Sequence, residues 1–208
     1  MIKPHLRNGR AFSGLTIGLL GGSFNPAHDG HLAMSLYALK QLGLDQVWWL
    51  VSPQNPLKSI ADMATLERRA GSARHSALHP RLIVTCIESE LGTRYTADTL
   101  RMLKRRFPGV RFVWLMGADN LRQIPKWKDW QNIFRLAPVA VFHRPGSVAG
   151  RGMGKAAIRF GKALKSSAKG KIIARLSRKD LPAWTLLDNK LNYTSATKIR
   201  KDNPKWRK

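Results

Sequence analysis

The chain has 208 residues, of which 43% are hydrophobic, and its 37 Lys and Arg against 12 Asp and Glu give a formal net charge of +25. That length predicts a single domain, and that apolar share is too high for a disordered polycation. The lone cysteine, Cys86, excludes an internal disulfide, and the lack of an 18-residue apolar run or an apolar leader predicts a cytoplasmic protein without a membrane span.

Six short runs of β-branched and aromatic residues predict strands. Most of these runs are continuously apolar, which is typical of strands covered on both faces. Helical patterns separate them, and this alternation predicts parallel strands joined by right-handed crossovers. We therefore expect an α/β fold, a Rossmann-like doubly wound parallel sheet with helices on both faces, in a single domain over residues 15–208. The predicted strands are Thr16–Leu20, Val47–Val51, Leu82–Ile87, Arg111–Met116, Val139–Phe142 and Trp184–Leu187.

Three helices are expected between the first four strands. Leucines at helical spacing on either side of Leu36 predict the first helix, and Gly43 is placed to end it. A second helix is expected to begin just after Thr65. Thr96 is expected to cap a third helix, which ends near Arg106.

Two segments depart from this alternation. Residues 1–14 are basic and without pattern, so we expect a flexible leader there. Residues 147–180 begin with several glycines and then carry ten Lys and Arg between Arg151 and Lys179. We interpret this segment as a basic insertion that faces solvent and holds much of the excess charge. Such a run is either a solvated face or a surface for an anionic partner.

The most informative stretch follows the first predicted strand and ends at His31. Gly21 and Gly22 let backbone amides approach an anion closely, and the start of the next helix adds N–H groups and the positive end of its dipole. His28 and His31 are three residues apart, so we expect both imidazoles on one side of the first helical turn. These features predict a polyphosphate site at the carboxyl end of the first strand.

Other interpretations of this stretch stay open. It has neither the Gly-Lys-Ser/Thr of a Walker A loop nor the Gly-x-Gly-x-x-Gly pattern. His28 and His31 could bind a metal with Cys86 as a third ligand, although no further ligand has a suitable spacing. A tight glycine turn with two incidental histidines is the structural alternative.

The sequence Gly-Gly-Ser-Phe-Asn-Pro-Ala-His-Asp-Gly-His-Leu over residues 21–32 resembles the signature of the nucleotidyltransferases related to class I aminoacyl-tRNA synthetases. Within them it is most similar to bacterial nicotinate-mononucleotide adenylyltransferases. That family usually has Asp-Pro-Pro where this chain has Asn25, Pro26 and Ala27. Further segments that resemble the family follow in the expected order: Pro53–Lys58, Arg94–Leu100, Met116–Leu121, Trp127–Trp130, His143–Gly146 and Thr194–Arg200.

The resemblance implies a role for each matching residue. His28 and His31 would be catalytic, because in the family this pair binds the ATP phosphates and stabilises the charge of the leaving pyrophosphate. ATP binding is implied for Gly21, Gly22, Ser23, Phe24, Gly30, Gly117, Asp119, Ser195, Thr197 and Arg200. Mononucleotide binding is implied for Ser23, Lys58, Tyr95, Thr96, Trp127 and Arg144. Leu57 stands where the family often has histidine, and Ala196 replaces a serine.

The reaction implied by the resemblance transfers the AMP of ATP to nicotinate mononucleotide, giving nicotinate adenine dinucleotide and pyrophosphate in NAD biosynthesis. A phosphate oxygen of the mononucleotide would attack the α-phosphorus in line, without a covalent enzyme intermediate. Mg²⁺ is the expected cofactor, held mostly by phosphates and water, with Asp119 as a candidate for a water-mediated contact. Association with further copies of the chain, as a homo-oligomer, also stays open.

Two rival functions account for parts of the same sequence. A transferase of the same superfamily could use another acceptor, such as phosphopantetheine or a sugar phosphate, but Trp127 and the Tyr95-Thr96 pair favour a pyridine pocket. A nucleic-acid-binding protein would explain the charge of +25 directly. No recognisable RNA- or DNA-binding motif supports that function, so no dedicated nucleic-acid partner is expected.

Overall fold

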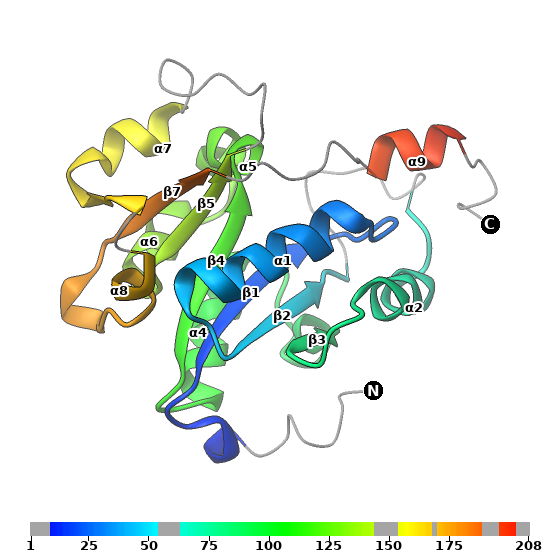
Figure 1. Cartoon of the computed structure of the whole chain (residues 1–208), viewed down its shortest axis with the longest axis horizontal. Coiled ribbons are helices and arrows are strands. Elements are labelled where there is room, and N and C mark those ends of the chain that lie inside the picture. The colour runs from blue at the N-terminus through cyan, green and yellow to red at the C-terminus, as the bar shows by residue number, and fades with distance from the viewer. Residues whose placement is uncertain (1–8, 54–62, 144–153, 168–169, 189–195, 203–208) are drawn as a thin grey trace.

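The computed structural model describes residues 9–53, 63–143, 154–167, 170–188 and 196–202. Within these ranges, seven strands form one sheet in the order β3-β2-β1-β4-β5-β7-β6, and every neighbouring pair is parallel (Figure 1). The α/β prediction is therefore confirmed. The strands are β1 (Thr16–Gly22), β2 (Gln46–Val51), β3 (Leu82–Thr85), β4 (Arg111–Gly117), β5 (Val139–His143), β6 (Leu164–Lys165) and β7 (Trp184–Asp188).

Helices cover both faces of the sheet, with α1 in front of it in Figure 1 and α4 and α6 behind. The front face carries α1 (Asp29–Leu42), α2 (Leu66–Ser76) and α8 (Gly170–Ala174). The other face carries η2 (Gly9–Phe12), α3 (Ile87–Glu90), α4 (Thr96–Arg106), α5 (Ala118–Gln123), η3 (Ile124–Lys126), α6 (Trp130–Leu136) and α7 (Gly154–Arg159). The remaining helical segments are η4 (Gly161–Ala163), η6 (Arg178–Asp180) and α9 (Ala196–Asp202).

Alternation along the strands divides the apolar residues between two cores. Ile17 and Leu19 of β1 pack with Trp48 of β2 beneath α4, whereas Leu20 and Trp49 pack beneath α1. Successive side chains of a strand point to opposite faces, so a strand that is apolar at every position supplies both layers. This arrangement confirms the doubly wound sheet with helices on both faces.

All six predicted strands form, and the third is shorter than expected. The hydroxyl of Thr85 accepts a hydrogen bond from the N–H of Ile87 at 3.1 Å, and the chain turns there into the short helix α3. A side chain that satisfies a nearby backbone group in this way competes with strand pairing. Strand β6, inside the basic segment, was not predicted because its two residues are exposed and carry no apolar pattern.

The helix boundaries are mostly those expected. Gly43 ends α1 in the left-handed conformation, with φ of 62°, and the hydroxyl of Thr65 accepts from the N–H of Arg68 at 3.3 Å to cap α2. The predicted cap of the third helix is wrong. Thr96 is the first residue of α4, and Tyr95 occupies the N-cap position without a side-chain hydrogen bond.

The leader prediction is wrong for residues 9–14. Residues Gly9–Phe12 form the 3-10 helix η2, and the buried ring of Phe12 meets Trp48 edge-on, with 5.4 Å between ring centroids. Burial of an apolar side chain of this size offsets part of the entropy that the backbone of this turn loses on ordering. Residues 1–8 lie outside the described residues.

The basic segment is more than a solvent-facing insertion. Ala156 of α7, the nearby Phe160 and Ile173 of α8 are buried, and β6 extends the sheet beside β7. Its charged residues face outward while these apolar ones pack on the domain. Residues 147–153 and 168–169 lie outside the described part of the segment.

The topology creates a crevice at the carboxyl ends of the central strands. Strand β1 pairs with β2 on one side and with β4 on the other, and the chain leaves β1 and β4 towards opposite sides. In open α/β sheets, ligands bind at such a switch point, outside the carboxyl ends of the strands. Among the described helices, none has the length and apolar content needed to cross a membrane.

Candidate active site

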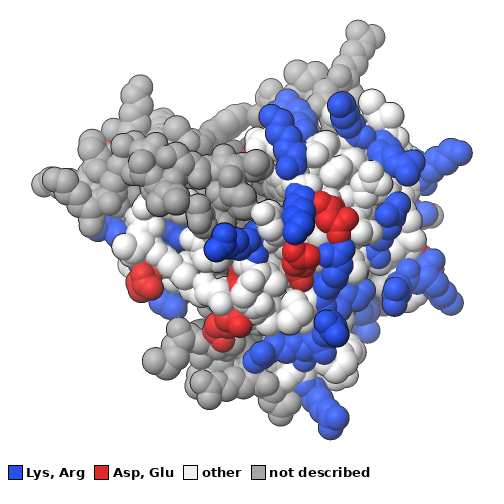
Figure 2. All heavy atoms as spheres, turned by 180° about the vertical axis from the view of Figure 1, so that it is seen from behind, with Lys and Arg blue, Asp and Glu red and all other residues white. Residues whose placement is uncertain are grey.

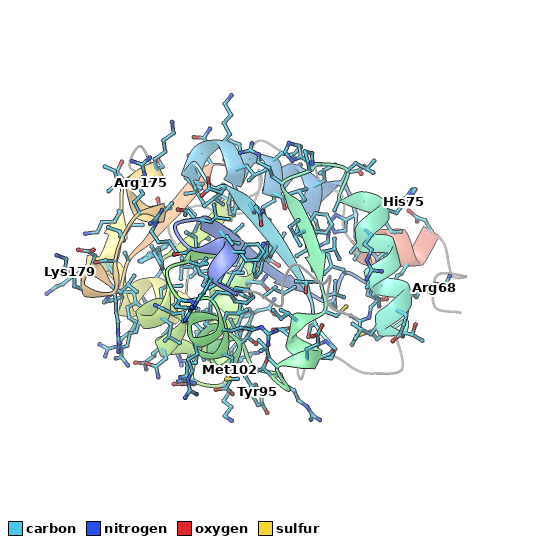
Figure 3. The ribbon with its side chains drawn as sticks, turned by 90° about the horizontal axis from the view of Figure 1, so that it is seen from below. Arg68, His75, Tyr95, Met102, Arg175 and Lys179 are labelled. Atoms are coloured by element: carbon cyan, nitrogen blue, oxygen red, sulfur yellow. The ribbon has the colours of Figure 1, made fainter. Side chains whose placement is uncertain are left out.

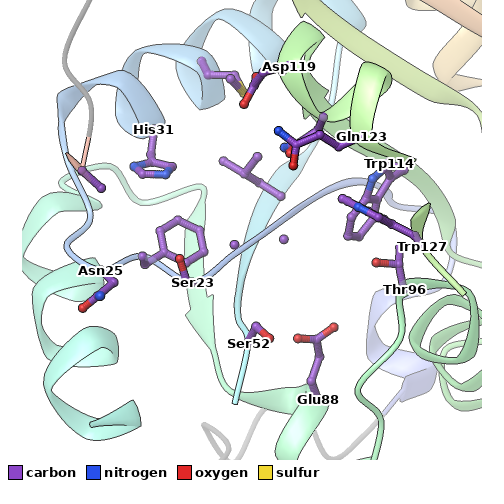
Figure 4. Close-up of a pocket in the computed structure, with 18 of the residues that line it drawn as sticks. Ser23, Asn25, His31, Ser52, Glu88, Thr96, Trp114, Asp119, Gln123 and Trp127 are labelled. Atoms are coloured by element: carbon purple, nitrogen blue, oxygen red, sulfur yellow. The ribbon is translucent and has the colours of Figure 1, made fainter. Parts of the chain in front are cut away.

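A cavity of about 410 Å³ opens at the carboxyl ends of β1 and β4 (Figure 4). Pockets that hold small organic ligands have about 300–1,000 Å³. The structure brings many of the predicted site residues to its wall: Gly21, Gly22, Ser23, Phe24, His28, His31, Tyr95, Thr96, Gly117, Asp119 and Trp127. Segments that lie far apart in the sequence thus meet in one small-molecule cavity.

The remaining predicted residues are placed differently. Gly30 belongs to the first turn of α1 and is not among the residues that line the cavity. Arg200 of α9 donates through Nη1 to the carbonyl oxygen of Asn25 at 2.5 Å, and Asn25 lines the cavity, so the C-terminal motif reaches the glycine turn. Thr197 also belongs to α9. Lys58, Arg144 and Ser195 lie outside the described residues.

Close packing shapes the end of β1, which runs two residues beyond the predicted end at Leu20, so that Gly21 and Gly22 pair with β2 before the chain turns. A Cβ at Gly21 would lie 2.6 Å from Cη2 of Trp114, a buried ring of β4, so glycine is needed for the two strands to pack this way. Phe24 then adopts a left-handed backbone with φ of 46°, which costs about 1–3 kcal/mol in a residue other than glycine. Its buried ring stacks on Trp49 at 5.1 Å between centroids, and this packing offsets the strain.

His28 and His31 form a capping pair at the start of α1. His28 is the N-cap residue with an extended backbone, so it precedes the first turn instead of belonging to it. Its Nδ1 accepts from the N–H of Gly30 at 3.1 Å, and Nδ1 of His31 accepts from the N–H of His28 at 3.2 Å. Because each Nδ1 is an acceptor, the ring hydrogen of each neutral imidazole lies on Nε2. The pair therefore donates through Nε2.

Packing fixes the orientation of these rings. The ring centroid of His31 lies 3.9 Å from that of His28 and 4.8 Å from that of Phe24. One turn later, the hydroxyl of Ser35 donates to the carbonyl oxygen of His31 at 2.8 Å and accepts from Nε1 of Trp49 at 2.7 Å. The histidine pair is thus held by both its own helix and strand β2, which preorganises its donors.

Arg69 is a buried cation that the sequence did not single out. Its side chain, 1% exposed, donates to the carbonyl oxygens of Ser23 at 2.8 Å, Ser52 at 2.7 Å, Ala64 at 2.9 Å and Pro53 at 3.1 Å. Desolvation by burial lowers the pKa of the Arg69 guanidinium. One side chain of α2 therefore joins the glycine turn to the end of β2.

The wall opposite the histidines is formed by the start of α4 and the loop after η3 (Figure 4). Thr96 and Trp127 lie there, and Tyr95 precedes Thr96. The ammonium of Lys128 lies 4.5 Å from the ring centroid of Tyr95, a cation–π contact. An indole, backbone amides at a helix start and nearby cations suit an aromatic ligand that carries negative charge.

Glu88 lines the same cavity and is also absent from the sequence predictions. Its side chain is 6% exposed, and its Oε1 accepts from the hydroxyl of Thr99 at 3.0 Å. Burial raises the pKa of Glu88 to about 7, and the hydrogen bond from Thr99 opposes part of that rise. Its place directly after β3, at the carboxyl edge of the sheet, is the signal that could have identified it.

Asp119 lies in the first turn of α5, directly after β4, with its carboxylate on the cavity wall. It folds back over Gly117, where a Cβ would collide with Oδ1 of Asp119. In the described part of the chain, no three His, Cys, Asp or Glu side chains gather in a way that could hold a metal ion. His28, His31 and Cys86, all among the described residues, form no such cluster.

The comparisons with known proteins agree with this geometry. The model of the cytidylyltransferase-like family matches residues 19–202. The chain belongs to this family. The cytidylyltransferase-like chain is 50% identical over 187 residues to a Parvibaculum lavamentivorans protein named "Probable nicotinate-nucleotide adenylyltransferase", covering 90% of this chain and 92% of the relative. A protein of the same name from Cereibacter sphaeroides is 49% identical over 193 residues, covering 93% and 100%.

Solved structures of similar fold support the same architecture. Nicotinic acid mononucleotide adenylyltransferase of Plasmodium falciparum, complexed with NaAD, superposes with a TM-score of 0.66 at 16% sequence identity. The alignment covers 89% of this chain and 82% of that one. The same parasite protein complexed with APC gives a TM-score of 0.65 at 15% identity, over 90% and 83%. These likenesses support the fold.

Proposed function

We propose that this cytidylyltransferase-like chain is a nicotinate-nucleotide adenylyltransferase, which transfers the AMP of ATP to nicotinate mononucleotide in NAD biosynthesis. The observation that carries the proposal is the His28–His31 pair, with rings 3.9 Å apart on the wall of the cavity at the start of α1. Relatives with 50% and 49% identity over nine-tenths of the chain carry the same enzyme name. The products are nicotinate adenine dinucleotide and pyrophosphate.

The reaction needs positioned donors and no general base, because the mononucleotide phosphate is already ionised. One of its oxygens attacks the α-phosphorus of ATP in line, a P–O bond forms, and the bond to the bridging oxygen of pyrophosphate breaks. Negative charge moves to the leaving pyrophosphate, with no covalent enzyme intermediate. The Nε2–H groups of His28 and His31 stabilise that charge, and Gly21 and Gly22 line the cavity beside the phosphates.

The same end of the cavity suits the rest of ATP. Ser23 adds a hydroxyl, and Arg200 reaches this turn through Asn25. Asp119 is positioned for the ribose or for a water of hydrated Mg²⁺. Since the described residues hold no cluster of metal ligands, the site fits an ion that arrives with the triphosphate, and Mg²⁺ bound there would neutralise phosphate charge.

The acceptor occupies the opposite wall. The indole of Trp127 stacks on the pyridine ring, and the amides at Tyr95 and Thr96 meet the ring carboxylate at the start of α4. Placing the two substrates at opposite walls directs the mononucleotide phosphate towards the histidines. Holding two anions that repel one another in this arrangement supplies most of the catalysis.

The proposal is tested by pyrophosphate release. The purified protein is incubated with ATP, Mg²⁺ and one acceptor at a time, namely nicotinate mononucleotide, nicotinamide mononucleotide, phosphopantetheine or a sugar phosphate. We expect release with the pyridine mononucleotides, fastest with the acid, and loss of activity when EDTA removes Mg²⁺. Release with phosphopantetheine or the sugar phosphate, and none with either pyridine substrate, would overturn the proposal.

A further inference from the structure

Glu88 is a buried acid in the cavity that adenylyl transfer does not use. It belongs to α3, and its side chain is 6% exposed. Figure 4 shows its carboxyl group directed into the cavity, on the same side as Thr96 and Trp127 and away from His31. An acid in this position faces the part of the cavity that the proposed function gives to the pyridine ring.

The surroundings of Glu88 connect it to that wall and, among the described residues, give it no cationic partner. The hydroxyl of Thr99 donates to Oε1 of Glu88 at 3.0 Å and lies 3.2 Å from the carbonyl oxygen of Tyr95. Across the described residues, no cation is hydrogen-bonded to Glu88 or forms an ion pair with it. Burial therefore raises the pKa of Glu88 to about 7, so both protonation states are accessible near neutral pH.

Other titratable groups also face this cavity, and their effects must be separated from that of Glu88. His28 and His31 line it from the start of α1, and Arg94 and Tyr95 from the segment before α4. Asp119 of α5, Lys126 of η3 and Lys128 are the other titratable groups of the described residues that line it. The histidines lie on the wall given to the phosphates, so they act on either pyridine mononucleotide through its phosphate, whereas a charge beside the ring substituent distinguishes the two and is controlled for by the Glu88→Gln variant. A comparison of two acceptors that differ only in the ring substituent cancels such shared effects.

We propose that Glu88 selects between a carboxylate and a carboxamide on the pyridine ring of the acceptor, an inference that rests on the proposed function. As a neutral acid, Glu88 donates its O–H to the ring carboxylate, and an ionised Glu88 takes that proton from water as the acid substrate binds. As a carboxylate, Glu88 repels the acid and accepts from the N–H of a carboxamide. Two carboxylates close together in a desolvated site share one proton for the same reason.

The kinetic test is the ratio of kcat/KM for nicotinate mononucleotide to kcat/KM for nicotinamide mononucleotide, measured from pH 6 to pH 9. We expect the ratio to fall by about tenfold per pH unit above pH 7, because one proton separates the two binding forms. In Glu88→Gln the ratio should not depend on pH. In Thr99→Val, which removes the donor that stabilises the carboxylate, the midpoint should move to higher pH by about one unit or more.

Calorimetry supplies a readout that does not require turnover. Binding of nicotinate mononucleotide at pH 8, in two buffers with different ionisation enthalpies, should take up about one proton per site. Binding of nicotinamide mononucleotide, or of either ligand to Glu88→Gln, should take up none. Thermal unfolding confirms that both variants are folded before they are compared.

Two outcomes would overturn the inference: a ratio that does not change with pH in the unaltered protein, or a Glu88→Gln variant that keeps the unaltered pH profile. Failure of the proposed function gives a different result, namely no pyrophosphate from either mononucleotide at any pH. The two failures are therefore distinguishable in the same set of assays.

Discussion

A histidine that caps a helix and a histidine that stabilises a phosphate use different nitrogens of the ring. In this chain, His28 and His31 accept backbone N–H groups through Nδ1, so only Nε2 can donate to a ligand. The cap also fixes which nitrogen carries the hydrogen. Each ring therefore stabilises the start of α1 and leaves Nε2 as the donor that the proposed chemistry needs, and we expect mutation to separate the two roles.

We expect His31→Ala to lower turnover by about 10²–10³, because one preorganised donor to the leaving pyrophosphate is lost. His31→Asn is the matched variant, since its Oδ1 can replace Nδ1 as the acceptor for the N–H of His28 but its side chain ends short of Nε2. Both variants should lose turnover, while thermal unfolding should show a loss of about 1 kcal/mol only in His31→Ala. Near-normal pyrophosphate release by a folded His31→Asn would contradict the role.

Glu88 should make the folded protein less stable as the pH rises. The pKa of Glu88 is about 7 in the fold against an ordinary value of 4.5, so between these values the folded state keeps a proton that the unfolded state has lost. Its stabilising effect is complete below pH 4.5 and is lost as the pH rises through 7, a change on the order of 3 kcal/mol. Denaturant midpoints should favour Glu88→Gln over the unaltered protein much more at pH 8 than at pH 5. An equal difference at both pH values would count against this assignment.

Prediction from sequence succeeded at residues that stand in recognisable runs. The glycine turn, His28, His31 and Trp127 were found because their order along the chain is specific, and the structure places them around one cavity. Glu88 was missed because its neighbours carry no motif and the third strand was expected to continue to Ile87. The early end of that strand depends on one hydroxyl–backbone hydrogen bond, which strand propensity does not reveal.

At the scale of elements, the packing of α2 against the ends of β1 and β2 depends on one side chain. Arg69 is enclosed and donates to backbone carbonyls, whereas Arg68 and His75 are exposed on the outer side of the same helix (Figure 3). In the sequence, Arg68 and Arg69 are adjacent and chemically identical. Which of them turns inward depends on the phase of the helix against the sheet, so sequence reasoning could not find the buried one.

Arg69→Met should destabilise the protein by at least about 3 kcal/mol. The variant keeps an apolar stem of similar length but leaves the buried carbonyl oxygens of Ser23, Ser52 and Ala64 without their donor, and each such group costs about 1–3 kcal/mol. Arg74→Met, at an exposed position of the same helix, is the control and should change stability by no more than about 0.5 kcal/mol. Urea unfolding midpoints measure both, and similar values for the two variants would refute the structural role.

Two glycine-to-alanine changes should have opposite signs. Gly21→Ala drives a methyl group into Cη2 of the buried Trp114, so we expect a loss of about 1–3 kcal/mol. Gly71→Ala, at an exposed position inside α2 where a Cβ meets no atom within 4 Å, should gain about 0.5–1 kcal/mol from helix propensity. Thermal unfolding distinguishes them, and a stabilised Gly21→Ala would show that β1 and β4 are not packed as described.

At the scale of the whole molecule, the charge of +25 is spread over several elements. Figure 2 shows Lys and Arg across one face with a few Asp and Glu among them. One ion pair joins Arg101 to Asp98 at 2.7 Å. The last turn of α4 alone carries Lys104, Arg105 and Arg106. We expected much of the excess positive charge in residues 147–180, but on the folded surface this charge is spread over several elements.

This surface should bind nucleic acid weakly and without preference. We expect Kd values of about 10⁻⁴–10⁻⁶ M at physiological salt, similar for RNA, single-stranded DNA and duplex DNA, because only phosphate contacts contribute. Filter binding over a salt series measures this. A Kd in the nanomolar range with a preference for one sequence or structure would instead indicate a dedicated nucleic-acid partner.

The enclosure of Arg69 has a consequence for how the enzyme responds to ionic strength. Mobile counter-ions collect around exposed ammonium groups and screen them beyond a Debye length of about 8 Å at 0.15 M, but they cannot enter the packed interior around a buried guanidinium. We therefore expect the charge of Arg69, which donates to the carbonyl oxygen of Ser23 after the glycines, to be screened less by salt than the charges of the outer cations. The affinity of the protein for the mononucleotide should accordingly fall less steeply with added salt than its affinity for a polyanion.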